Sequence, residues 1–445
     1  MAIFAAENPL GIKRRELFSG LSLTFDLSEG RGPGHALRVA LICERMALTL
    51  RLRAPERLML FYSALLHDSG IPFISPALCR ALGPWARMEN ELLHKHPASA
   101  WGGMRHWELL DAGGGAAHRA LTSHTLKGGE LARRLGFPSA VARTIACHHE
   151  LPGGTGYPRG LTRRRIPRLA RIISLADKLD YILSLEASGD VPSALELVEE
   201  RRELFDPEVL SAFRKGLSGD GALLDGLLSP TLREELLKGL PEEWEVLSQR
   251  ELMETAAWLG GASDIKSGYR APHSLKVGAL VEAMGRVLGV RGRRLLALRL
   301  SGLLHDIGVL SIESRIPEKR NSLEAAERRT LRAHSLFSEK ALSAAGFPPS
   351  LAFWAASHHE RPDGRGYPRG LKGGEIPLEG RLLALADAYS ALTSPRPFRP
   401  ALSRKASLSL IMEEEVGKFD EALFAPLISL TRGHPKPSGR PFPSR

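Results

Sequence analysis

The sequence predicts an all-α protein made of two tandem helical bundles of one type. Apolar residues recur at intervals of three and four along segments such as 35–52 and 293–306, and alternating β-branched runs are rare. A set of histidines and aspartates also occurs twice, in the same order and with matching spacings. Helical periodicity and an internal repeat together predict two helical domains of the same architecture.

The bulk composition indicates a soluble globular chain. Its 445 residues are 43% hydrophobic and 25% charged, and no apolar run approaches the roughly 18 residues of a membrane helix. The N-terminal segment lacks the extended apolar core of a signal peptide. The three cysteines have no paired spacing, so they predict neither a disulfide framework nor a thiolate zinc site. We therefore expect a cytoplasmic enzyme with no membrane partner.

The net charge of +11 is spread along the chain. Arginine and lysine form only short clusters, without the interleaved aromatic residues of a single-strand binding platform. This pattern argues against a nucleic acid as the partner. A small substrate that carries phosphate would be attracted by the same field.

Each half carries a first His, a His-Asp pair, a third His, a His-His pair and a last Asp. The first His precedes the His-Asp pair by 32 positions in both halves, the third His precedes the His-His pair by 24, and the last Asp follows that pair by 28. We interpret the chain as a tandem duplication. The residues are His35, His67, Asp68, His124, His148, His149 and Asp177 in the first half, and His273, His305, Asp306, His334, His358, His359 and Asp387 in the second.

One spacing differs between the halves. The third His follows the Asp of the pair by 56 positions in the first half and by 28 in the second, which indicates an insertion near 82–115. His96, inside this window, has a suitable spacing from the His-Asp pair to replace His124 as the third ligand. We favour His124, because its spacing to the following His-His pair is intact.

The repeat and the turn residues set the expected domain boundaries. We expect a first domain over 14–216, which includes the insertion, and a second domain over 251–430. A helical connector punctuated by Pro and Gly spans 217–250. The tail over 431–445 contains four prolines and is expected to be disordered.

The repeated residue types are those of a metal centre. Helices in a bundle bring side chains together in one cavity. Imidazole and carboxylate without thiolate suit iron, manganese or zinc, and a shared carboxylate suits two ions. Ten histidines and four aspartates in two matching registers favour this interpretation over a set of unrelated core histidines.

The segments LSGLLHDIG and HHERPDGRGYPRGL resemble the signature of the HD-GYP family of metal-dependent phosphohydrolases, which belongs to the HD superfamily. The resemblance implies HD-type bundles with two divalent ions per competent site, iron or manganese before zinc. It implies a catalytic pair, His305 and Asp306. It also implies that Asp306 bridges one ion held by His273, His305 and Asp387 to a second held by His334, His358 and His359.

The same resemblance implies a cyclic dinucleotide substrate, cyclic di-GMP first, and hydrolysis mainly by the second half. The expected substrate-binding residues are Asp363, Gly366, Tyr367, Pro368, Arg396, Arg399 and Lys319. The family's Lys after the His-Asp pair is absent, because Ile71 and Val309 occupy its positions. The first half also has Glu186 and Gly153 where the second has Arg396 and Asp363. We therefore expect the first half to bind metal but to grip substrate poorly.

Two other functions are compatible with these residues. One is a phosphohydrolase that acts on another cyclic or linear nucleotide. The other is a non-catalytic HD module for signalling or binding, in which the missing Lys marks lost catalysis. The segment around Arg396 and Arg399 also has a simple alternative as a solvated basic turn. Homodimerisation and signalling protein partners fit either function.

Overall fold

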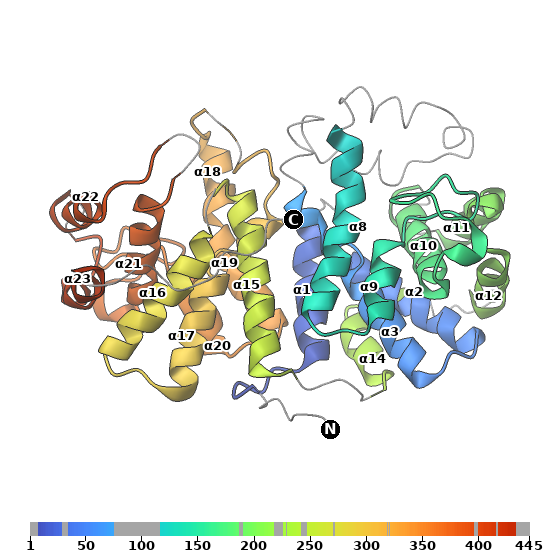
Figure 1. Ribbon diagram of the computed structural model, residues 1–445, viewed down its shortest axis with the longest axis horizontal. Helices are drawn as coiled ribbons and strands as arrows, with labels where there is room; N and C mark the ends of the chain where they lie inside the picture. Colours follow the sequence, from blue (N-terminus) through green and yellow to red (C-terminus); the bar gives the residue numbers. More distant parts are fainter. Residues whose placement is uncertain are drawn as a thin grey trace.

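The computed structural model describes residues 8–28, 34–74, 116–186, 190–217, 226–227, 229–241, 247–269, 272–317, 319, 321–395, 399–414 and 417–432. Within these ranges the chain is mainly helical and forms no β-strand, so the predicted all-α class is confirmed (Figure 1). The predicted insertion over 82–115 and most of the predicted tail lie outside the described residues. The expected domain boundaries stay predictions.

The first bundle occupies one side of the molecule in Figure 1. Its ligand-bearing segments follow one another in the predicted order. The elements are α1 (Arg14–Ser28), α2 (His35–Thr49), α3 (Ala54–Leu66), η1 (Ile71–Phe73), α8 (Ala116–Arg134), α9 (Ser139–Ala146), η3 (Arg163–Arg165), α10 (Arg168–Tyr181), η4 (Ile182–Glu186), α11 (Val191–Glu200), η5 (Arg202–Leu204) and α12 (Pro207–Leu217).

Helix α14 (Leu232–Lys238) lies in the connector, and the second bundle follows it. Its elements are α15 (Gln249–Lys266), α16 (His273–Val287), α17 (Gly292–Leu304), η6 (Ile307–Ser311), α18 (Ala325–Arg332), α19 (His334–Ala344), α20 (Pro349–Ala356), η7 (Gly373–Glu375), α21 (Leu378–Leu392), α22 (Arg404–Ser409), η8 (Leu410–Glu414), η9 (Glu421–Leu423) and α23 (Phe424–Arg432).

Local sequence explains where several helices begin and end. Ser248 starts α15 with a capping box, in which its hydroxyl accepts from the amide of Glu251 at 3.2 Å and the Glu251 carboxylate accepts from the Ser248 amide at 2.8 Å. Asp190 caps the start of α11 through its carboxylate alone, which accepts from the amide of Ser193 at 3.0 Å. Gly346 follows α19 with a φ of 78°, a conformation that favours glycine at helix ends.

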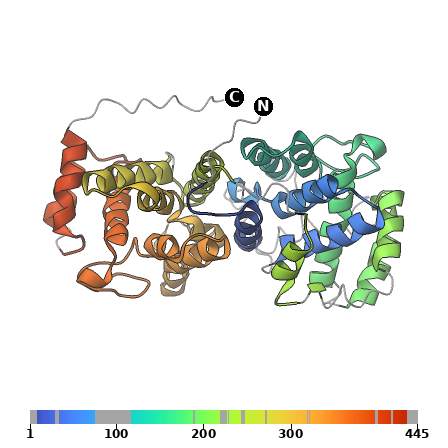
Figure 2. The same ribbon diagram turned by 90° about the horizontal axis from the view of Figure 1, so that it is seen from below.

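Helix α1 belongs to the first half of the chain but packs against η6 and α19 of the second. In both views it lies between the two bundles (Figures 1 and 2). A Cβ on Gly20 would lie 2.3 Å from the carbonyl carbon and oxygen of Ala344, and 2.4 Å from the amide nitrogen of Ala345. Only a glycine at this position allows such a close approach of the two backbones.

Further contacts join the halves. The Arg233 guanidinium of α14 donates to the carbonyl of Ala344 at 2.8 Å and to the hydroxyl of Ser19 at 2.9 Å. From the other half, α15 packs against η1, where the Trp258 and Phe73 rings are 4.4 Å apart. One continuous cluster of buried apolar residues runs through both bundles. Among the described residues, no helix is both long and apolar enough to span a membrane.

We predict that Gly20→Ala destabilises the protein by about 1–3 kcal/mol, because the new Cβ would clash with backbone atoms of Ala344 and Ala345, which cannot move away as a flexible side chain could. Gly261→Ala is the matched control. It also lies inside a helix, but its Cβ would meet nothing within 4 Å, so it should stabilise by about 0.5–1 kcal/mol. Urea unfolding of the two variants measures the difference. Equal effects of the two substitutions would show that the α1 contact contributes nothing to stability.

Candidate metal centres

Most of the predicted ligands lie at or close to helix ends, and all of them converge inside their bundle. In the second bundle His273 begins α16, the His-Asp pair follows α17 and His334 begins α19. The His-His pair follows α20, and Asp387 lies in the middle of α21. The first bundle repeats this arrangement on α2, α3, α8, α9 and α10, except that its third His lies within α8 rather than at its start.

The structure brings all fourteen predicted ligands together in two clusters. Within each group below, the ligand atoms lie within 4.8 Å of one another. The first bundle has two groups that share Asp68; the second has three overlapping groups. They are His35, His67, Asp68, Asp177; Asp68, His124, His148, His149; His273, His305, Asp387; His305, Asp306, His358; and His334, His358, His359. His124 lies in its cluster, whereas His96 lies outside the described residues.

Asp306 lies between the two halves of its cluster. Its Oδ1 is 3.2 Å from Nε2 of His334 and 3.5 Å from Nε2 of His358, whereas its Oδ2 is 3.5 Å from Nε2 of His305. On the far side, Oδ1 of Asp387 is 3.0 Å from Nε2 of His273. One carboxylate oxygen of Asp306 thus faces each group, as a bridging ligand between two ions requires.

Main-chain carbonyls fix the orientation of most ligand imidazoles. Nδ1 of His305 lies 2.9 Å from the carbonyl of Gly302, and Nδ1 of His358 lies 2.6 Å from that of Ala355. His67, His148 and His334 make the same contact with the carbonyl three residues earlier, at 2.6–2.7 Å. Because Nδ1–H donates to the carbonyl, Nε2 carries the lone pair and faces the cluster.

Glycine allows the His-Asp segment to pack against the helix of the third His. A Cβ on Gly308 would lie 2.0 Å from the carbonyl oxygen of His334, and a Cβ on Gly70 would lie 2.0 Å from that of His124. No other residue fits either position without moving a ligand. These two glycines therefore set the distance between the His-Asp pair and the third His.

Burial and charge favour the ligating protonation states of most of these groups. Burial lowers the pKa of His358 and lowers that of His359 further, so both imidazoles are neutral. Burial raises the pKa of Asp306, but the charge of His305 outweighs it and holds the pKa well below its usual range. Asp306 is therefore an anion at neutral pH.

His305 differs from the His-His pair. Burial lowers its pKa, but the charges of Asp306 and then Asp387 outweigh burial, and the pKa is raised. When no metal ion is bound, the His305 imidazole therefore carries a proton, and this positive charge lies beside the two carboxylates. Metal binding at this position would release that proton.

The donor set fits a pair of transition metals. The buried Nε2 atoms of His148, His273 and His305 lie 3.0–3.5 Å from a carboxylate oxygen but form no hydrogen bond of suitable geometry. A buried polar atom without a partner is costly, and a cation would satisfy all three. Imidazole and carboxylate donors without a thiolate match iron, manganese or zinc.

In the second bundle, a buried glutamate holds the loop that follows the His-His pair. Glu360 is 2% exposed, and its carboxylate accepts from the amides of Arg369 at 2.6 Å and Leu371 at 2.9 Å. A Cβ on Gly366 would lie 2.4 Å from the amide nitrogen of Arg361. The motif alone does not reveal the structural roles of Glu360 and Gly366. The internal repeat could have indicated the role of the glutamate, because Glu150 accepts from two loop amides of the first bundle in the same way.

Tyr367 is the predicted substrate residue that lies closest to the ligands. Its ring is 4.6 Å from that of His359, and a cis peptide bond joins it to Pro368. Burial raises the pKa of Tyr367, and the charges of Asp306 and Asp387 raise it further. The phenol therefore stays protonated and remains a hydrogen-bond donor.

Other predicted substrate residues have partners of their own. The Asp363 carboxylate accepts from the amide of Arg365 at 2.9 Å and pairs with Arg361. Lys319 lies 2.6 Å from Glu327. Arg399 donates to the last carbonyls of α21, at 2.9 and 3.3 Å, and Arg396 lies outside the described residues. The structure does not bring Lys319 or Arg399 into contact with the ligands, and their substrate roles stay predictions.

The residue behind the first histidine differs between the bundles. Nδ1 of His35 donates to the Asp180 carboxylate at 2.7 Å, and Arg38 also donates to that carboxylate, at 2.5 Å. In the second bundle, the matching position is Ser390, whose hydroxyl lies 3.0 Å from Nδ1 of His273. The sequence shows this difference, but not that these residues touch the histidines.

The two clusters also differ in exposure. All seven ligands of the first bundle are buried, and the Asp68 and Asp177 side chains are 6% and 0% exposed. In the second bundle His359 is partly exposed, and the Asp306 and Asp387 side chains are 14% and 16% exposed. The second cluster is therefore more accessible to solvent than the first.

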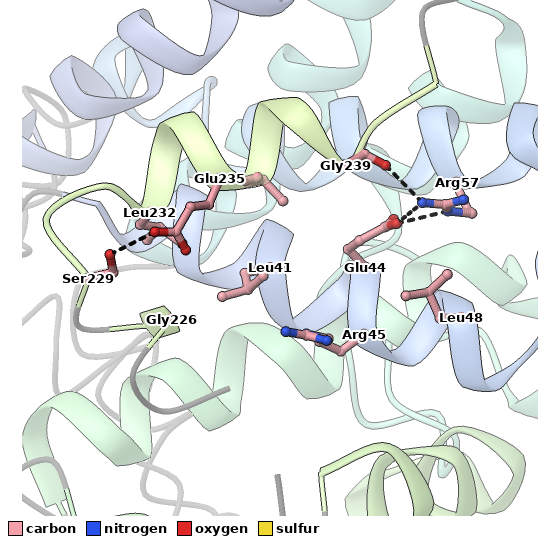
Figure 3. Close-up of a pocket in the computed structure, with 11 residues that line it drawn as sticks. Leu41, Glu44, Arg45, Leu48, Arg57, Gly226, Ser229, Leu232, Glu235 and Gly239 are labelled. Carbon is pink, nitrogen blue, oxygen red and sulfur yellow. Dashed lines mark hydrogen bonds and ion pairs between the residues drawn. The ribbon is translucent and has the colours of Figure 1, made fainter. Parts of the chain in front are cut away.

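A cavity of about 440 Å³ lies elsewhere in the first bundle, between α2 and α14 (Figure 3). Leu41 and Arg45 line it from α2, and Glu235 lines it from α14. Arg57 pairs with Glu44 beside it. None of the fourteen ligands lines this cavity, so it is separate from both clusters.

A protein-family model and several known proteins match this chain. The family model described as HD domain matches residues 115–209 and 249–423. A protein of Vibrio cholerae serotype O1 named 3'3'-cGAMP-specific phosphodiesterase 3 is 29% identical over 436 residues, which cover 93% of each chain. From the same organism, 3'3'-cGAMP-specific phosphodiesterase 1 is 30% identical over 314 residues, 68% of this chain and 72% of that protein.

A solved structure is similar over both bundles. It is the crystal structure of a cyclic GMP-AMP specific phosphodiesterase of V. cholerae, V-cGAP3, with 27% sequence identity and a TM-score of 0.66. The match covers 95% of this chain and 99% of that chain. The arrangement of two bundles in one chain is therefore common to both proteins.

We predict that each cluster binds transition metal. Protein purified without oxygen should contain iron, manganese or zinc, and His273→Ala combined with His358→Ala should remove about two ions per chain, because each ion loses a ligand. Elemental analysis measures this, with circular dichroism as the control for folding. A folded variant that keeps its full metal content would contradict the assignment of these ligands.

Proposed function

This chain belongs to the HD domain family and is a hydrolase, and on that premise we propose that its second bundle hydrolyses a phosphodiester bond of a cyclic dinucleotide. The observation that carries the proposal is the position of Asp306, whose partly exposed carboxylate has one oxygen toward each group of ligands. The names of the similar proteins support this substrate class.

The ligands of the second bundle would hold the two ions. Asp306 would bridge them, with His273, His305 and Asp387 on one side and His334, His358 and His359 on the other. When bound, the ions would supply an acidified water and neutralise the phosphate. The protein's part is to fix the Nε2 lone pairs through the Nδ1 contacts and to keep Asp306 anionic.

The Tyr367 phenol, still protonated beside Asp306 and Asp387, would donate a hydrogen bond to a phosphate oxygen. Asp363, Gly366 and Pro368 belong to the same loop as Tyr367, and we propose that they take part in substrate binding together with Lys319, Arg396 and Arg399. Of these, Gly366 and Pro368 act through the backbone shape that places Tyr367 beside His359.

Among cyclic dinucleotides, we propose 3'3'-cGAMP as the first substrate to test and cyclic di-GMP as the second. The relatives that match most of this chain are named for the former. The motif resemblance alone favoured the latter. Both carry two phosphodiester bonds between purine nucleosides, so the metal cluster alone does not separate them.

We propose that the first bundle holds metal in a supporting role. The Asp180 carboxylate behind His35 would raise the basicity of that imidazole and strengthen its grip on an ion. A stronger donor also leaves the ion less able to acidify water. The second bundle has neutral Ser390 at the matching position, and its cluster is more exposed. Both features suit catalysis better than tight retention of metal.

We predict that the protein, reconstituted with iron or manganese under reducing conditions, converts 3'3'-cGAMP or cyclic di-GMP into a linear dinucleotide. Asp306→Ala should lower turnover by a factor on the order of 10³ or more, because the bridging carboxylate is lost. Chromatography of the products measures both. Full activity in a folded Asp306→Ala variant would exclude the two-metal site, and no conversion of either substrate by the unmodified protein would exclude the proposed activity.

The two bundles can be compared within one chain. We predict that His305→Ala with Asp306→Ala removes nearly all phosphodiesterase activity, whereas His67→Ala with Asp68→Ala leaves most of it. The matched variants remove the same pair of ligands, so only the site differs. If the first-bundle variant were inactive and the second-bundle variant active, the first bundle would be the catalyst.

A further inference from the structure

Arg332 ends α18, two residues before the ligand His334. Its guanidinium carbon lies 5.1 Å from the centre of the Tyr367 ring, and that ring is 4.6 Å from the ring of His359. The Arg332 side chain is exposed. A positive charge is therefore held against an aromatic face, one ring away from a predicted metal ligand.

Nearby cations differ from Arg332 in what they contact. Lys319 pairs with Glu327, Arg361 pairs with Asp363, and Arg369 pairs with Glu339 at 2.5 Å. Arg332 has no acidic partner among the described residues. A guanidinium that lies over an aromatic ring makes this contact through its face. The N–H donors of the guanidinium therefore remain available to an anion.

A cyclic dinucleotide carries two phosphates, and the metal cluster can neutralise only the one that is cleaved. The second phosphate needs another cation at the mouth of the site. The lysine that the family places after the His-Asp pair is replaced here by Val309, which is 3% exposed and carries no charge.

We propose that Arg332 binds the second, non-scissile phosphate of the substrate and so selects for dinucleotides; this rests on the function proposed above. Its planar group is suited to two parallel hydrogen bonds with a phosphate. The first bundle keeps the ring pair, with Tyr157 and His149 4.8 Å apart, but has Thr122 at the matching position. The anion site is thus specific to the second bundle.

The test compares two substrates. Arg332→Gln should lower kcat/KM for 3'3'-cGAMP by about 10- to 100-fold, the loss expected for hydrogen bonds to a charged group. The same variant should change kcat/KM for bis(p-nitrophenyl) phosphate, which has a single phosphate, by less than about threefold. Arg332→Lys should recover part of the loss, because it restores the charge without the planar fork.

Arg293→Gln is the matched control. It removes one positive charge at the start of α17, roughly 18 Å along the helix from His305, and should leave both substrates unaffected. Metal content is measured in every variant. Equal losses on both substrates, or no loss on 3'3'-cGAMP, would overturn the role of Arg332.

Calorimetric titration of 3'3'-cGAMP separates this inference from the proposed function. If the unmodified protein bound the dinucleotide without cleaving it, the proposed function would fail, and the affinity ratio between the unmodified protein and Arg332→Gln would decide the role of Arg332. A ratio above about tenfold would support it, and equal affinities would overturn it. If the unmodified protein neither bound nor cleaved cyclic dinucleotides, both proposals would fail.

Discussion

The hydrogen bond from a histidine Nδ1 to the carbonyl three residues earlier is the contact that orients five of the ten histidines in the two candidate metal centres. His67, His148, His305 and His358 make it where a helix ends. The last carbonyls of a helix have no partner within it, so the contact satisfies one of them and selects the imidazole tautomer at the same time. At these four positions the contact requires the helix to end beside its histidine.

This constraint explains why the sequence predicted so much of the site. Three of the four spacings between successive ligand residues are the same in both halves, so all fourteen candidate ligands could be named from their positions. The same logic favoured His124, which the structure brings into its cluster. The all-α class followed from periodicity, and the HD family followed from the residues around the His-Asp and His-His pairs.

What the sequence could not supply are contacts between segments that share no periodic pattern. Asp180 lies 145 residues from His35, and Arg332 lies 35 residues from Tyr367; neither pair has a spacing that indicates contact. Arg399 matched a basic position of the family, but its donors reach the end of α21. A charge in a motif shows that a cation is present, and packing decides which group it contacts.

The docking of α1 on η6 and α19 has a consequence for the independence of the two halves. A protein cut at the expected boundary near residue 250 would separate the second bundle from α1 and from Arg233, and it would uncover the surface on which Gly20 lies against Ala344. The second bundle would then present apolar surface to water and favour self-association. Although the two bundles share a ligand pattern, the second therefore depends on its neighbour to cover this surface.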